Sequence, residues 1–455
     1  MRLTRKLFAV SVATLGGLSF AAFARGQVPP VPEEPRALPP SVTGALPRPT
    51  PPVSPAAGTS VPSASVAETA AAPIARFHDL STFPPETVQA VYSMRAGAAW
   101  LYRMNQANGR FLYGLNPALR MPLAGDNDFR QALAALALAE AARFTGEQEL
   151  SARATQAVMV LLTLTKPDPS DPTCRVPEAP SDRCNRVGLA AVLALAAYQI
   201  PDAKLHAEAE SLCAFLRKQC CPNGAINHTD TPTDDPGKTD PEGACTYPGL
   251  ALRAIAVSHR AKPEAWKRDA AMRATVYYRS TFRAQPTAAL AATLIHGCVE
   301  FYFANGKDAA SRDAAFEMAD WLCACQHTRA DARVAAWAGG FKAGQAPAQA
   351  SLEPGVESAT CAAALVAAAK LTRQVPDLAR FNKYRAAAVD GLAFARGLQF
   401  TEESAEHFER AFRARFLTGG VHLTPTNGLL RVDATALVVD AQLAFLESGA
   451  EARAE

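Results

Sequence analysis

The chain has 455 residues, 49% of them hydrophobic, and a formal net charge of +3. This much apolar material suffices for one large core or two ordinary ones, so the chain as a whole is neither disordered nor fibrous. Its Lys and Arg residues form no basic block, which argues against nucleic acid or an anionic membrane surface as a partner.

Residues 1–24 have the pattern of a cleavable signal peptide. Arg2, Arg5 and Lys6 precede an apolar run that ends in a small-x-small sequence, so we expect cleavage after Ala24. A signal anchor is the alternative, but the apolar run is short and contains Ser, Thr and two glycines. We therefore expect a secreted or periplasmic protein with no stable membrane insertion after cleavage.

Residues 25–75 are rich in Pro, Ala, Ser and Thr and have few large apolar side chains. Such a stretch cannot bury enough surface to offset the entropy of ordering it, so we predict a disordered, extended linker. A Pro-rich ligand for a binding module is an alternative that only the Pro content supports. Residues 76–450 form the folded domain, with ordered structure expected to begin near Phe83.

Two kinds of predicted helix alternate along this domain. Helices of the first kind are amphipathic and charged, with one face suited to solvent: Glu86–Gln106, Glu147–Leu164, Asp202–Gln219, Pro263–Arg279, Asp308–Cys325 and Asp377–Gln399. Helices of the second kind are rich in Ala and Leu and suited to burial on all sides: Asn127–Phe144, Arg186–Tyr198, Tyr247–Val257, Ala288–Phe303, Glu357–Leu371 and Asp433–Glu447.

This alternation is expected when helical hairpins form two concentric rings, with the apolar helices inside. We therefore predict an all-α (α/α)6-type toroid of six helical hairpins, without convincing strand patterns. An open solenoid of hairpins would also show the alternation and stays an alternative.

A short motif recurs after four of the outer helices. Each helix ends in Gln, and a Gly before an apolar residue follows: Gln106 with Gly109 and Phe111, Gln219 with Gly224 and Ile226, Gln326 with Gly339 and Phe341, and Gln399 with Gly419 and Val421. Gly permits a sharp backbone turn, and the apolar residue can return to the bundle. We interpret the motif as structural.

Several segments resemble bacterial α/α-toroid proteins, the superfamily of six-hairpin glycosidases, uronyl epimerases and terpenoid cyclases. They are Gln106-x-Asn-Gly-x-Phe, Asn127-Asp-Phe-Arg-Gln-Ala, Thr145-Gly-Glu and Leu429-Leu-Arg-Val-Asp-Ala-Thr. The resemblance covers most of the chain after residue 84 and implies a toroid. In such proteins a Gln-His pair often follows the last segment, but this chain has Ala436 and Leu437 there, so chemistry that relies on that His is in doubt.

The long predicted loops lie mostly between an outer helix and the next inner helix, so they should gather at one mouth of the toroid. The N-termini of the inner helices meet there and favour an anionic or strongly polar ligand. The expected partner is a polysaccharide or another anionic ligand, and no cofactor is expected.

Side chains at this mouth are the candidate site residues. The acid/base candidates are Glu357, Asp433 and Asp126; the candidate substrate clamps are Arg130, Arg186 and Arg431; and the candidate sugar-stacking rings are Tyr113, Tyr247 and Trp337. An acidic residue at a helix start is commonly an ordinary cap, and an aromatic ring commonly packs its own loop. Those structural readings stay open for each residue.

The spacing of the cysteines bears on both disulfides and metal sites. In an exported protein, Cys174 with Cys184, and Cys220 or Cys221 with Cys245, bracket loops that a disulfide would close. The pairs His296 with Cys298 and Cys323 with Cys325 lack the spacing of a structural zinc site, and the Asp-rich loop 230–240 lacks the regular ligand alternation of a calcium loop. We predict no metal site.

Two functions of different class fit these features. The first is a carbohydrate-active enzyme, a hydrolase, lyase or epimerase that acts on an acidic glycan. The second is a non-catalytic toroid that binds a glycan or protein through the same mouth. Carboxylates facing each other across an open cleft would favour the enzyme, and mouth residues engaged in caps and mutual ion pairs would favour the binder.

Overall fold

The computed structural model describes residues 72–178, 185–228, 241–330, 334–345 and 352–449. The predicted signal peptide and almost all of the predicted linker lie outside these residues. The described part begins with the short helix η1 (Pro73–Phe77), whose Phe77 ring packs 6.0 Å from the ring of Phe144. A second short helix, η2 (Leu80–Thr82), leads into the first long helix.

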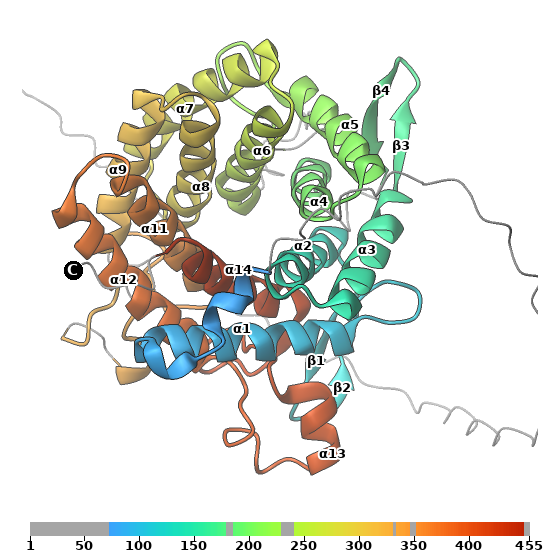
Figure 1. The fold of residues 1–455 in the computed structure, drawn as a ribbon, viewed down its shortest axis with the longest axis vertical. Helices are drawn as coiled ribbons and strands as arrows, with labels where there is room; N and C mark the ends of the chain where they lie inside the picture. Colours follow the sequence, from blue (N-terminus) through green and yellow to red (C-terminus); the bar gives the residue numbers. More distant parts are fainter. Residues whose placement is uncertain (1–71, 179–184, 229–240, 331–333, 346–351, 450–455) are drawn as a thin grey trace, which may run out of the picture. The chain divides into compact units, whose positions relative to one another are not determined.

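Twelve long helices among the described residues form an outer and an inner ring (Figure 1). The outer ring contains α1 (Pro85–Met104), α3 (Gln148–Leu162), α5 (Ala203–Gln219), α7 (Ala265–Ala284), α9 (Ala309–Ala324) and α12 (Leu378–Gly397). The inner ring contains α2 (Asp128–Thr145), α4 (Arg186–Gln199), α6 (Pro241–Ala261), α8 (Ala288–Ala304), α11 (Ser358–Thr372) and α14 (Val432–Glu447). The predicted alternation of charged and apolar helices is confirmed.

The inner ring is closed. Each inner helix packs against the next one in the chain, and the last, α14, packs against both α1 and α2. The first and last hairpins therefore meet, which confirms the α/α toroid and excludes the open solenoid.

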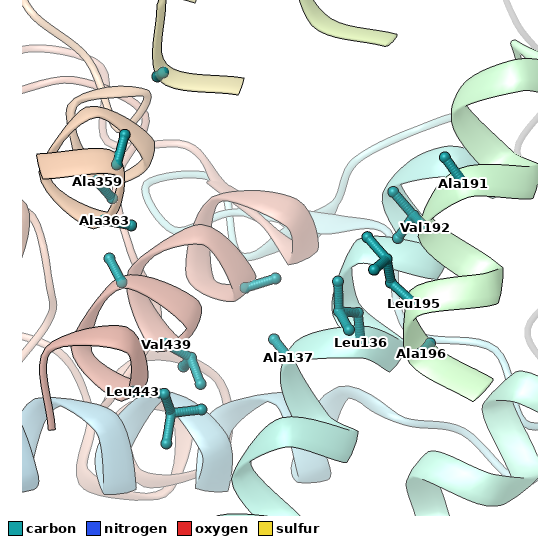
Figure 2. Packing of buried hydrophobic residues seen from close by; sticks show 14 of the residues in the cluster. Leu136, Ala137, Ala191, Val192, Leu195, Ala196, Ala359, Ala363, Val439 and Leu443 are labelled. Atoms are coloured by element: carbon teal, nitrogen blue, oxygen red, sulfur yellow. The ribbon is translucent and has the colours of Figure 1, made fainter. Parts of the chain in front are cut away.

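Burial explains why the two kinds of helix differ in composition. Every residue of α4 from Val187 to Ala197 is buried, whereas α5 buries only the face that carries Leu205, Leu212 and Leu216. Figure 2 shows the side chains of α2 and α4 meeting inside the ring. The many Ala residues let the inner helices approach closely. Because an inner helix is apolar on all sides, removing every side from water stabilises the fold.

The expectation that the domain is helical throughout is wrong in the long loops. Strands β1 (Gly114–Asn116), β2 (Met121–Pro122) and β5 (Leu430–Arg431) form an antiparallel sheet in the order β2-β1-β5. Strands β3 (Thr165–Asp168) and β4 (Asp171–Pro177) form a hairpin beside α5. Strands of two to seven residues are too short to show a clear alternation in the sequence.

The recurring Gly motif is a structural turn at the mouth end of four outer helices. Isolated β-bridges join Asn105 to Phe111, Cys220 to Ile226, Gln326 to Phe341 and Gln399 to Val421. Gly109, Gly224, Gly339 and Gly419 all have positive φ, between 81° and 95°. In the first turn the amide that donates to the Gly carbonyl belongs to Asn105, one residue before the expected Gln106.

Three of these turns lie directly on the backbone of a neighbouring outer helix, and at Gly339 a Cβ would overlap the Asp390 carbonyl of α12. A Cβ at Gly224 would overlap the Arg273 carbonyl of α7, and a Cβ at Gly419 would overlap the Ala96 carbonyl of α1. Both backbone conformation and space therefore require glycine at these positions.

We expect Gly224→Ala and Gly419→Ala each to lower the free energy of unfolding by about 2 kcal/mol or more, because strain and overlap act together. Gly397→Ala, in the last turn of α12, is the control: a Cβ there would meet no atom within 4 Å. Denaturant unfolding monitored by circular dichroism measures the three changes. Equal effects of Gly419→Ala and Gly397→Ala would contradict this account of the turns.

Candidate active site at the mouth of the toroid

The long loops and the N-termini of the inner helices lie at one end of the rings. The connections α1–α2, α3–α4, α5–α6, α9–α11 and α12–α14 are long, whereas α7 and α8 are joined by only three residues, 285–287. Asn127 and Asn185 cap α2 and α4 by accepting backbone N–H groups. The predicted mouth is confirmed as an arrangement of helices and loops.

An ion-paired cluster occupies part of this mouth. Arg431 donates two hydrogen bonds to the Asp433 carboxylate, at 3.0 and 2.8 Å, and Arg130 Nε lies 3.5 Å from Asp433 Oδ2. Arg130 also donates to the hydroxyl of Tyr113. The Tyr113 carbonyl accepts from Val432 N at 3.1 Å, beside the β1–β5 pairing, so the loop after α1 and the start of α14 are joined here.

The charges of this cluster support one another. Asp433 is only 6% exposed, so its carboxylate depends on the two guanidinium groups for stabilisation. Burial works against the charge of Arg431, but hydrogen bonds and attraction from Asp433, with smaller contributions from Tyr113 and Glu357, outweigh it and raise the pKa of Arg431. The cluster is thus a fixed ion pair with half-buried guanidinium edges.

Glu357, the second acid/base candidate, has an exposed side chain. It immediately precedes α11, and its side chain does not cap that helix. A Cβ on Gly355 would meet the Glu357 carboxylate, so the side chain lies back over its own loop. Its influence on the pKa of Arg431 places it within electrostatic reach of the ion pair.

The third acid/base candidate, Asp126, belongs to a different network. Arg110 donates to Asp126 Oδ2 at 2.8 Å and to Asp128 Oδ1 at 2.5 Å. Gln131 donates to the other oxygen of Asp126 at 2.8 Å, and its amide also holds the backbone of Phe111. These contacts tie the turn after α1 to the first turn of α2.

The other candidates are engaged elsewhere around the mouth. Arg186 lines a hollow of about 480 Å³ at the β3–β4 hairpin, together with Lys166 and Glu178. Tyr247 packs edge-on against Phe129, with ring centroids 5.2 Å apart.

Trp337 lies in the short helix η4 (Ala335–Trp337) and packs 5.5 Å from the ring of His327. The structure therefore brings Tyr113, Arg130, Arg431 and Asp433 into one cluster, with Glu357 within electrostatic reach of it. It does not show Arg186 or Trp337 in that cluster.

Sequence reasoning missed a second group of ionisable side chains, inside the inner ring. Arg253 Nη2 of α6 lies 3.6 Å from Glu140 Oε1 of α2 and 3.9 Å from Asp440 Oδ1 of α14. Arg253, Asp440 and His296 of α8 also line an enclosed cavity of about 40 Å³. The sequence does show that each of these charged or imidazole residues stands within a largely apolar helix, which could have indicated a buried polar group.

Burial controls the protonation of this lumen cluster, which consists of Glu140, Arg253, His296 and Asp440. Burial, together with the neighbouring Asp440, raises the pKa of Glu140 well above its ordinary value, although Arg253 opposes this. Burial, with a smaller effect of Arg253, lowers the pKa of His296 to about 4. The Nε2 atom of His296 and the Oε2 atom of Glu140 are buried without a hydrogen-bond partner.

The predicted disulfide between Cys220 or Cys221 and Cys245 is wrong, because all three thiols are free. Helix α6 begins at Pro241, earlier than predicted, so Cys245 lies inside it and its Sγ is 3.5 Å from Thr287 Oγ1. Cys174 is also free and buried, and its proposed partner Cys184 lies outside the described residues.

The described residues contain no group of three or more His, Cys, Asp or Glu side chains placed to hold a metal ion. The Asp-rich loop considered for calcium, residues 230–240, is not among them. No helix in the described ranges combines the length and apolar character needed to cross a membrane.

The chain matches no family model and no curated protein in sequence. In structure it is similar to an unsaturated glucuronyl hydrolase specific for heparin, at 15% identity, with 79% of this chain and 97% of that chain covered and a TM-score of 0.55. The unsaturated glucuronyl hydrolase of Bacillus sp. GL1 is 15% identical, with 78% and 96% covered and a TM-score of 0.56. An α-1,6-mannanase of Salegentibacter sp. HEL1_6 is 11% identical, with 78% and 98% covered and a TM-score of 0.53. The chain thus shares the α/α-toroid fold of these proteins.

The lumen cluster predicts how stability responds to acid. Unfolded His296 takes up a proton near pH 6.5, whereas the folded protein takes it up only near pH 4, so stability is lost as pH falls between these values. We expect His296→Gln to remove this loss, so that the melting temperature of the variant rises relative to that of the wild type as pH falls from 6.5 to 4.

The exposed His78 provides the matched control, and His78→Gln should leave the pH dependence unchanged. Melting curves at half-unit pH steps measure all three proteins. A constant difference between wild type and His296→Gln across this range would show that His296 is not held neutral.

Proposed function

We propose that the mouth of this toroid binds an acidic saccharide and that the domain is a binding module rather than a hydrolase. Six inner helices direct their N-termini to this end, and each carries a partial positive charge there. Arg130 and Arg431 keep 31% and 22% of their side chains exposed, so both present N–H groups to a ligand. A guanidinium fork matches a sugar carboxylate well.

The observation that carries the proposal is the engagement of Asp433. A general acid or base needs a carboxyl oxygen within hydrogen-bond reach of the substrate. Both oxygens of Asp433 are occupied by Arg431, and Arg130 approaches one of them. Asp126 is likewise held by Arg110 and Gln131. Two of the three predicted acid/base residues thus support the structure of the site.

One observation favours an enzyme as the second candidate function. Glu357 is exposed and within electrostatic reach of Arg431, so its carboxylate could act on a saccharide bound to that guanidinium. A hydrolase, lyase or epimerase would have to assign its proton transfers to this group and to a partner other than the engaged Asp433.

The similar structures support a saccharide ligand. They include unsaturated glucuronyl hydrolases, one specific for heparin, and an inactive variant of the α-1,6-mannanase in complex with α-1,6-mannotriose. An acidic sugar agrees best with the paired guanidinium groups of this chain. From the predicted signal peptide, we propose that the domain binds such glycans outside the cytoplasm.

Calorimetric titration with short oligouronates tests the proposal. We expect binding to the wild-type chain and a loss of at least about tenfold in affinity in the double variant Arg431→Gln/Asp433→Asn, which removes both charges without leaving either partner buried and unpaired. The control is Arg268→Gln, on the exposed surface of α7. Equal affinity of the double variant and the control would refute binding at this cluster.

Product analysis on the same oligouronates separates the two candidate functions. The binding proposal predicts complex formation without new reducing ends, unsaturated products or epimers. If products appear, and Glu357→Gln abolishes them while binding persists, the protein is an enzyme and the binding-module proposal is wrong.

A further inference from the structure

A groove of about 530 Å³ lies at the mouth end of the toroid, away from the ion-paired cluster. One wall is the β1–β2 turn with Asn116 and Ala118, and the other is the long α12–α14 connection with Phe400, Phe408 and His422. The volume is within the range of small-molecule sites, roughly 300–1,000 Å³. None of the residues named above as mouth candidates lines it.

An exposed arginine adds a contact between the two sides of the groove, beyond the pairing of β1 with β5. The Arg120 guanidinium lies 5.2 Å above the ring of Phe412 and 3.4 Å from Glu409 Oε2. Phe412 and Glu409 belong to the segment at α13 (Arg410–Phe412), which lies on the same side of α1 as β1 and β2 (Figure 1). Chain segments almost 300 residues apart thus form a two-sided groove.

The chemistry of the lining fits an uncharged ligand with both apolar and polar faces. Among the described residues that line the groove, none is Asp, Glu, Lys or Arg. The rings of Phe400, Phe408 and His407 provide flat apolar surface, with Phe408 lying 6.2 Å from Phe400 and 4.3 Å from His407. Asn116, Ser404 and Asn427 add amide and hydroxyl groups.

His422 adds a polar atom that the protein leaves unused. Its ring packs 4.2 Å from Phe400, and its Nε2 atom is buried with no hydrogen-bond partner. Burial lowers the pKa of His422, so the imidazole is neutral at physiological pH and can donate or accept a hydrogen bond. An unsatisfied buried nitrogen is costly, so the protein gains stability if the ring turns toward the groove that it lines and Nε2 meets a ligand hydroxyl.

A short sheet links the groove to the ion-paired cluster. Strand β1 (Gly114–Asn116) directly follows Tyr113 of the cluster and ends at Asn116 in the groove, and three residues of extended strand span about 10 Å. Strand β5 pairs with it and leads from Leu429 in the groove to Arg431 in the cluster. A single extended ligand can therefore contact both sites.

We propose that this groove binds the neutral sugar residues of a saccharide whose acidic residue lies at Arg130 and Arg431. Sugar rings offer C–H faces to the aromatic rings and hydroxyls to the amides and to His422. The extension to one continuous ligand rests on the proposed function of the mouth. Binding of neutral saccharide in the groove stands on the groove alone.

Titration of the full mature chain with neutral oligosaccharides of three to five residues tests the inference. Ala118→Trp fills the groove from an exposed turn position without removing a contact, and we expect it to weaken neutral-saccharide binding by about tenfold or more. Leu119→Trp is the matched control, because Leu119 is exposed, lies next in the chain and does not line the groove. It should bind as the wild type does.

A monomeric uronic acid separates the two sites. Ala118→Trp should leave its binding unchanged, whereas Arg431→Gln/Asp433→Asn should weaken it and spare the neutral oligosaccharides. The groove proposal is wrong if neutral oligosaccharides do not bind the wild-type chain. It is also wrong if they bind Ala118→Trp as tightly as Leu119→Trp. If the wild-type chain binds neutral oligosaccharides but not the uronic acid, only the proposed function of the mouth is contradicted.

Discussion

Close packing within the inner ring is the constraint on which the rest of this structure depends. A Cβ at Gly249 would overlap the backbone of Thr293, and one at Gly297 would overlap Leu252, so α6 and α8 approach closely enough to exclude any side chain at these glycines. Ala-rich neighbours continue this packing around the ring until α14 meets α1 and α2. Because each inner helix follows an outer helix and runs back antiparallel to it, all six inner N-termini face one end, and closure of the ring brings the long loops together there.

The same packing limits where a ligand can bind. The cavity on the ring axis holds only about 40 Å³, space for little more than one water molecule. The proposed saccharide is too large for this cavity, so it would bind at the mouth and across the loops there. Below it, the side chains of Glu140, Arg253 and Asp440 are only 8%, 18% and 21% exposed, and the attraction of Arg253 for the two carboxyl groups offsets part of the cost of this burial.

The helical framework was predictable from the sequence because apolar and amphipathic helices differ in composition over ten or more residues. The ion pair of Arg431 with Asp433 was not predictable, since the helix dipole alone would explain an Asp in the first turn of α14. The lumen cluster required knowing that Glu140, Arg253 and Asp440, on three separate inner helices, point to one axis. The groove depends on the short pairing of β1 with β2 and β5, which leaves no periodic pattern.

The division of charge between mouth and groove bears on how a ligand would be selected. An Arg431 guanidinium already paired with Asp433 is well oriented, but part of its attraction for an anion is spent within the protein. Binding at the mouth alone would then be weak and sensitive to salt. The uncharged groove, about 10 Å away along β1, adds aromatic and amide contacts that salt does not screen. Selectivity would thus depend on the order of acidic and neutral residues in the glycan as well as on its charge.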